Sequence, residues 1–199
     1  MNNFLCLHGL FQNKDIIKKY FTPLLKSINS TGVYIDAPYN VIPHYEKLKK
    51  LRVIYKNDFD DYKSWTKYPI TMNSNDCYTL KYIAEYLHDN KDINGIIGFS
   101  QGAMIASLLN TNFFYEQYNI KNNINKIILI SGFMYDNEYI YNIYNSGVIN
   151  INSIHIIGKN DPIIKPEKSI HLYNMYPQGN IIYHNGGHNV PRDIFKKIE

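Results

Sequence analysis

The fold class of this 199-residue chain is decided by the stretch Gly95-Ile96-Ile97-Gly98-Phe99-Ser100-Gln101-Gly102-Ala103-Met104. Its first half is continuously apolar, which is typical of a strand covered on both faces. Its second half opens a helical stripe of apolar residues. Between the two lies a G-x-S-x-G pentapeptide, in which a serine at a sharp strand-to-helix turn projects its hydroxyl above the sheet. Glycine at both ends avoids a collision with the neighbouring strand or helix.

Short apolar runs alternate with helix-like segments along the rest of the chain. In addition to 95–99, strands are expected at 3–7, 33–38, 126–130, 154–158 and 180–184. Stripes at helical spacing cover 16–28, 80–87, 104–109 and 169–176. The alternation predicts an α/β fold in one domain over 1–199, with a six-stranded, mostly parallel sheet and helices on both faces.

A serine hydroxyl is a weak nucleophile at neutral pH and needs a base. With a serine turn of this kind, an acid and then a histidine are expected further along the chain. Asp161 follows the fifth expected strand and His188 follows the sixth, so we expect them to complete a triad with Ser100. Three alternatives stay open, one for the acid and two for the base: Asp136, His184 and His171.

The tetrahedral intermediate of such a reaction needs backbone N–H donors for its oxyanion. Gln101 directly follows the serine, and its N–H lies at the positive end of a helix dipole. The loop after the first strand supplies the second donor in this kind of fold. We expect that donor to be Leu10, with Phe11 as the alternative.

Composition and charge narrow the class of protein. The net charge of +4 is too small to indicate a nucleic-acid partner, and the basic run 47–52 is interpreted as a solvated face. The 2 cysteines form no disulfide framework. No apolar run approaches the roughly 18 residues that span a bilayer, and no signal peptide is recognisable. We therefore expect a cytoplasmic protein; its oligomeric state is not indicated.

Two segments, 39–75 and 132–150, do not fit the alternation and are expected to be packed loops. Loops that follow parallel strands gather at the edge of the sheet where ligands bind. Their apolar and aromatic side chains are predicted to line an acyl pocket: Trp65, Tyr68, Phe133, Met134 and Tyr139. Plain loop packing is the alternative for each of them.

Several of these stretches together resemble the FSH family of serine hydrolases, within the α/β-hydrolase superfamily. They are 5–9 with 12–13, 64–65, 95–103, 131–133, 158–161 and 186–191, which reads Gly-Gly-His-Asn-Val-Pro. The resemblance implies a compact α/β-hydrolase fold without a large cap domain, no metal or organic cofactor, and a small-molecule carboxylic ester or thioester as substrate. Segment 39–64 departs from the family pattern, and the two leading strands of the full fold are absent.

Two competing functions remain open from the sequence. A hydrolase scaffold can serve as a non-catalytic binding module, because a fold does not determine a function. A flavodoxin-like redox protein would need a phosphate-binding loop after the first strand, and His8-Gly9-Leu10-Phe11 is a poor one. The triad does not distinguish an oxygen ester from a thioester, because both pass through the same tetrahedral intermediate.

Overall fold

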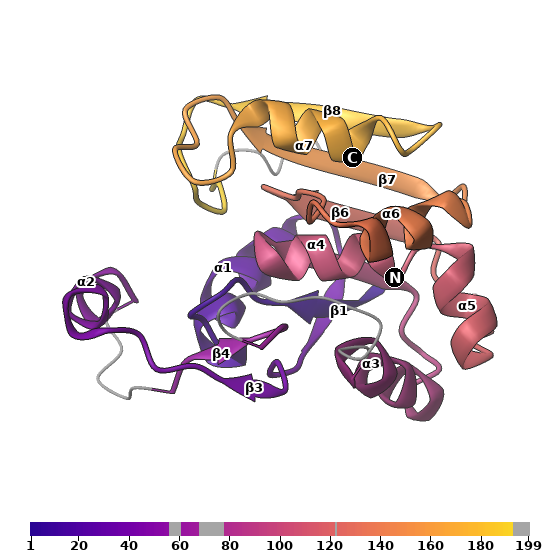
Figure 1. Ribbon diagram of the computed structural model, residues 1–199, viewed down its shortest axis with the longest axis horizontal. Helices are drawn as coiled ribbons and strands as arrows, with labels where there is room; N and C mark the ends of the chain where they lie inside the picture. Colours follow the sequence, from indigo (N-terminus) through magenta and orange to yellow (C-terminus); the bar gives the residue numbers. More distant parts are fainter. Residues whose placement is uncertain (56–60, 68–77, 122, 193–199) are drawn as a thin grey trace.

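The computed structural model describes residues 1–55, 61–67, 78–121 and 123–192 (Figure 1). Its centre is a sheet of six strands in the order β2-β1-β5-β6-β7-β8. The strands are β1 (Asn3–Leu7), β2 (Thr31–Tyr34), β5 (Gly95–Phe99), β6 (Lys126–Ile130), β7 (Asn152–Gly158) and β8 (Gly179–His184). Every neighbouring pair is parallel, so the expected α/β sheet is confirmed.

Helices cover both faces of this sheet, as expected. One face packs on α1 (Lys14–Ser27), whose buried Phe21 and Leu24 meet Phe4 of β1 and Ile97 of β5. The other face packs on five helices: α3 (Tyr78–Asp89), α4 (Gln101–Leu108), α5 (Asn112–Tyr118), α6 (Glu138–Asn145) and α7 (Pro166–Tyr173). The four inner strands β1, β5, β6 and β7 are therefore buried on both sides, which explains their continuous hydrophobicity.

Five elements were not expected from the sequence. They are the helices α2 (Tyr45–Tyr55), α5 and α6, and the strands β3 (Tyr39–Asn40) and β4 (Lys63–Ser64), which form a small antiparallel sheet. Helix α6 begins where the side chain of Asn137 accepts a hydrogen bond from the amide of Ile140 at 2.8 Å. Segments 39–75 and 132–150 therefore contain regular structure where loops were expected.

Strand β2 also ends earlier than expected, at Tyr34. Beyond it the chain leaves the sheet, and the amide of Ala37 donates to Nε2 of His8 at 3.0 Å instead of to a strand. Within the described ranges, no helix is both long and apolar enough to cross a membrane.

Candidate active site

The turn at Ser100 carries the strain that the sequence pattern predicts. Strand β5 ends at Phe99 and α4 begins at Gln101, with Ser100 between them at φ 54° and ψ −118°. Positive φ is unfavourable for a residue with a side chain, and the amide of Ser100 is anchored to the carbonyl of Ile130 at 2.9 Å. The turn therefore holds the hydroxyl above the ends of the strands.

Both glycines of the pentapeptide are required by close backbone contacts. A Cβ added to Gly98 would overlap the backbone of Gly102, and one added to Gly102 would overlap the carbonyl of Leu7. Any side chain at either position would push the helix away from the sheet, which is why only glycine fits there.

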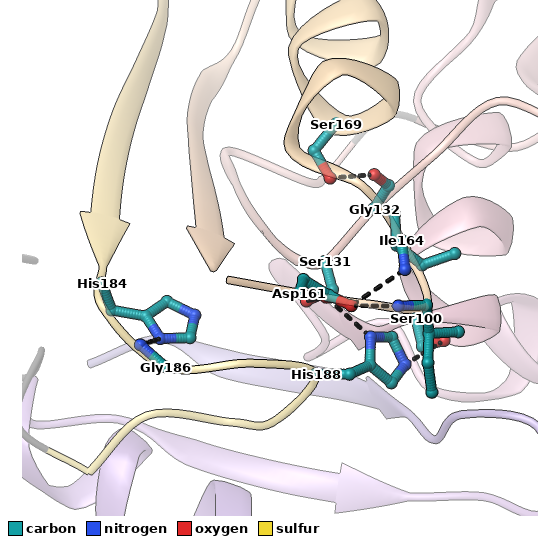
Figure 2. Close-up of polar contacts among 10 residues, drawn as sticks. Ser100, Ser131, Gly132, Asp161, Ile164, Ser169, His184, Gly186 and His188 are labelled. Atoms are coloured by element: carbon teal, nitrogen blue, oxygen red, sulfur yellow. Dashed lines mark hydrogen bonds and ion pairs between the residues drawn. The ribbon is translucent and has the colours of Figure 1, made fainter. Parts of the chain in front are cut away.

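Three side chains from the ends of different strands meet at this turn (Figure 2). His188 Nε2 lies 3.0 Å from Ser100 Oγ, and His188 Nδ1 lies 2.7 Å from Asp161 Oδ2. A carboxylate only accepts hydrogen bonds, so Nδ1 carries the ring proton and Nε2 is left to accept from the hydroxyl. This is the arrangement that a serine nucleophile with its base and orienting acid requires.

Asp161 is held as a charged acceptor by its surroundings. Its Oδ1 accepts hydrogen bonds from the amides of Ile163 and Ile164, each at 2.9 Å, and its Oδ2 also accepts from Ser131 Oγ at 3.0 Å. Burial by itself raises the pKa of the Asp161 carboxyl. The hydrogen bonds from His188 and the two amides outweigh that effect and bring the pKa below its ordinary value.

The three alternative residues lie in other surroundings. Asp136 is exposed and accepts a hydrogen bond from the Tyr141 hydroxyl at 3.2 Å, and His171 is exposed on α7. Figure 2 shows His184 well apart from Ser100, with Nδ1 accepting from the amide of Gly186 at 3.2 Å. None of the three is brought to the serine turn.

Two amides lie where an oxyanion hole is expected. Gln101 is the first residue of α4, so its N–H has no acceptor inside the helix. Among the hydrogen bonds of the described residues, none uses the amide of Leu10, whereas the amide of Phe11 donates to Lys63 O at 3.1 Å. Leu10 is therefore the better placed of the two candidate donors after β1.

The loop that carries Leu10 is held in shape by His8, a residue whose role the sequence analysis missed. His8 is fully buried, and burial lowers its pKa to about 4. The neutral ring donates from Nδ1 to Gly9 O at 2.8 Å and accepts at Nε2 from Ala37. The amide of Gly9 in turn donates to Gln12 Oε1 at 2.7 Å. These hydrogen bonds hold the loop in one conformation. The sequence feature that could have indicated this role is a histidine at the end of a strand.

Trp65 has a supporting role in place of the predicted pocket position. Its side chain is fully buried, its indole N–H donates to His8 O at 2.7 Å, and its amide donates to Gln101 Oε1 at 3.0 Å. The side-chain amide of Gln101 also donates to Thr66 Oγ1 at 3.0 Å. Segment 64–66 therefore ties the two candidate oxyanion donors together from inside the protein.

A cavity of about 670 Å³ opens at Ser100 and His188. It is lined by the loop 9–12, by α2, by Ile163 and Ile164, and by 188–190. Of the predicted pocket residues only Phe133 lines it; Trp65, Met134 and Tyr139 do not, and Tyr68 lies outside the described residues. Met134 and Tyr139 pack instead against the large core cluster, which corrects their expected positions.

No cluster of three or more histidine, cysteine or acidic side chains in the described part of the chain could hold a metal ion.

Comparisons with known proteins show the family of the chain. A family model described as serine hydrolase (FSH1) matches residues 1–197. Family of serine hydrolases 2 from Saccharomyces cerevisiae is 31% identical over 131 residues, a match that spans 60% of this chain and 57% of that protein. Esterase OVCA2 from Danio rerio is 26% identical over 94% of this chain and 89% of its own length.

Solved structures share the fold at low identity. SOBER1 from Arabidopsis thaliana superposes with a TM-score of 0.66 at 16% identity, covering 99% of this chain and 95% of its own. Acyl-protein thioesterase 2 from Zea mays superposes with a TM-score of 0.64 at 16% identity, covering 99% and 90%. With the family model matching almost the whole length, the chain belongs to the serine hydrolase (FSH1) family.

Proposed function

We propose that the protein hydrolyses carboxylic esters or thioesters through an acyl-enzyme formed on Ser100. His188 is the general base and acid, Asp161 orients its ring, and the amides of Leu10 and Gln101 bind the oxyanion. The observation that carries the proposal is the position of the His188 ring, which lies 3.0 Å from the serine oxygen and 2.7 Å from the carboxylate.

The reaction follows from this geometry in two halves. Ser100 Oγ attacks the substrate carbonyl carbon while its proton passes to His188 Nε2, and the two amides receive the negative charge that forms on the carbonyl oxygen. The tetrahedral intermediate then collapses, and His188 protonates the departing alcohol or thiol. Water deprotonated by His188 attacks the acyl-enzyme, and the acid and free serine are released.

The chemical class of substrate is supported by the cavity and by the relatives. Leu10, Phe11 and Phe133 give the cavity apolar walls next to Ser100, and these favour the hydrocarbon part of an acyl group. The relatives and structural neighbours carry names of esterases and of an acyl-protein thioesterase. A small-molecule ester or thioester that fits the cavity is therefore the proposed substrate.

The test is a pre-steady-state assay with p-nitrophenyl hexanoate and, in parallel, an acyl thioester with a thiol indicator. We expect a burst of product equal to the enzyme concentration, because acylation releases the first product before water completes the cycle. Ser100→Ala should abolish both burst and turnover. Ser153→Ala is the matched control, since this buried hydroxyl lacks a partner among the described residues and lies on β7.

A burst retained by Ser100→Ala would contradict the proposal. Binding of the esters by the wild-type protein without any turnover would favour the non-catalytic binding module instead. The ratio of the ester rate to the thioester rate decides between the two substrate classes.

A further inference from the structure

Helix α2 forms the wall of the cavity farthest from the sheet, and Figure 1 shows it set apart from the other helices. Four of its cavity residues, Lys47, Lys50, Leu51 and Ile54, follow the spacing of a single helical face. The basic run 47–52 was interpreted as a solvated face. The structure corrects this for Lys47, which is partly buried; Lys50 lines the cavity but is exposed, and Lys49 and Arg52 do not line it.

Lys47 is the more constrained of the two cations. Its ammonium nitrogen lies 4.0 Å from the centre of the Phe11 ring, in a cation–π contact. The side chain is partly buried, and this burial lowers the pKa of Lys47. Among the described residues no carboxylate forms an ion pair with Lys47. A partly dehydrated ammonium group thus has an aromatic face as its neighbour and can still bind an anion.

Positively charged side chains outnumber negatively charged ones on the described cavity wall. Glu46 is the one acidic residue among them; its side chain is 73% exposed, and its Oε1 lies 3.9 Å from Nζ of Lys49, which does not line the cavity. Lys50 adds a second cation on the cavity face of α2. An anion in the cavity would meet two ammonium groups and one carboxylate already paired with another lysine.

The position of the cations relates them to the reacting centre. Phe11, which contacts Lys47, directly follows the proposed oxyanion donor Leu10, and both line the cavity with Ser100. A substrate whose carbonyl lies at Ser100 therefore extends toward α2 with its acyl or its leaving part.

We propose that the cavity selects esters or thioesters that carry a negatively charged group, and that Lys47, assisted by Lys50, binds this group. The proposal rests on the hydrolase function above and specifies its substrate class. Lys47 acts on substrate affinity and takes no part in the chemistry at Ser100.

The test compares three chromogenic esters of equal acyl length. They are neutral p-nitrophenyl hexanoate, p-nitrophenyl hydrogen adipate with a carboxylate on the acyl side, and a hexanoate of a hydroxy-nitrobenzoic acid with a carboxylate on the leaving side. We expect the wild-type protein to favour one of the anionic esters over the neutral one by about fivefold to tenfold in kcat/KM, after correction for leaving-group reactivity. Which ester is favoured identifies the side of the substrate that faces α2.

Lys47→Met should bring the ratio of kcat/KM on the favoured anionic ester to that on the neutral ester down to about one, because methionine keeps the apolar stem and loses the charge. Lys49→Met is the matched control on the same helix and should keep the preference. Equal rates on all three esters in the wild type, or a preference unchanged in Lys47→Met, would overturn the proposal.

Binding to the Ser100→Ala variant separates this proposal from the hydrolase function. Calorimetric titration with the hydrogen adipate ester and with the neutral ester should show the anionic ester binding about fivefold to tenfold tighter. This difference should vanish in the Ser100→Ala, Lys47→Met double variant. If the wild type hydrolyses no ester but the binding difference is found, the hydrolase function fails and the anion site stands; equal binding overturns the anion site alone.

Discussion

The two walls of the cavity are built in different ways. On the triad side, each side chain stands at the end of a strand of the main sheet, and Asp161 alone accepts from His188, Ser131, Ile163 and Ile164. On the opposite side, α2 lies outside the sheet, and Val53 and Ile54 are 78% and 61% exposed. In the proposed reaction, the residues that carry out the chemistry thus lie at the ends of the sheet strands, and those that select the substrate lie on a helix outside the sheet.

The largest loss of activity is expected from a substitution of His188, the central residue of the proposed triad. His188→Gln should lower kcat/KM on a neutral ester by about 10⁴-fold, because the serine loses the base that accepts its proton. His184→Gln, only four positions earlier in the chain, should stay within about threefold of the wild type. Steady-state kinetics measure both; similar losses in the two variants would place the base elsewhere.

A large loss of stability is expected where helix α4 touches the sheet. Gly102→Ala should lower the free energy of unfolding by about 3 kcal/mol, because its Cβ would overlap the carbonyls of Leu7 and His8. Gly187→Ala is the control, since its Cβ would lie 3.4 Å from Asn160 O, an ordinary contact. Urea unfolding gives both values, and an equal cost in the two variants would contradict the tight fit at the serine turn.

Two buried histidines, His8 and His155, should make the folded protein less stable at acidic pH. Burial lowers the pKa of His8 and of His155 from 6.5 to about 4, so the unfolded chain binds these protons more readily than the folded protein. Stability is therefore full above pH 6.5 and falls toward pH 4, by up to about 1.4 kcal/mol per pH unit for each histidine. The free energy of unfolding, measured with urea at several pH values between 4 and 6.5, should depend less steeply on pH in His155→Leu than in the wild type. An unchanged pH dependence would contradict the role of His155.

The smallest effect is expected on the α2 wall. Ile54→Ala should lower kcat/KM for p-nitrophenyl octanoate by about threefold and leave p-nitrophenyl acetate unchanged, because Ile54 lines the cavity but remains largely exposed. Val53→Ala, its neighbour outside the cavity lining, should change neither rate. If both variants behaved alike on the two esters, α2 would not form part of the acyl site.

The difference between the two walls also explains what the sequence could predict. The turn at Ser100 is encoded locally, since a strand, a strained serine and two glycines follow one another within ten residues. Asp161 and His188 follow apolar runs that have to be neighbouring strands of a parallel sheet. Their approach to Ser100 therefore follows from topology, and the six-stranded sheet was predicted correctly.

Helix α2 could not be predicted in the same way. Its apolar residues lie among lysines, and its buried Leu51 packs in a small cluster with Phe11, Val41 and Tyr62, which lie outside the helix. Such a helix depends on tertiary packing more than on its own sequence. For the same reason, the sequence could not predict that Lys47 and Lys50 line the cavity.

Trp65 illustrates a related error. An aromatic residue in a long segment near the expected site suggested a pocket wall, yet its indole N–H has an acceptor in the interior, His8 O. The contact between the two residues could not be predicted, because the antiparallel pairing of β3 with β4, which precedes Trp65 in the chain, was not expected.

The most direct measurement of the central claim is covalent labelling with a fluorophosphonate, read by intact mass and peptide mapping. We predict one adduct per chain, on Ser100, in the wild type and none in Ser100→Ala, with labelling strongly slowed in His188→Gln. An adduct of the same yield in Ser100→Ala, or one mapped to another serine, would contradict the account.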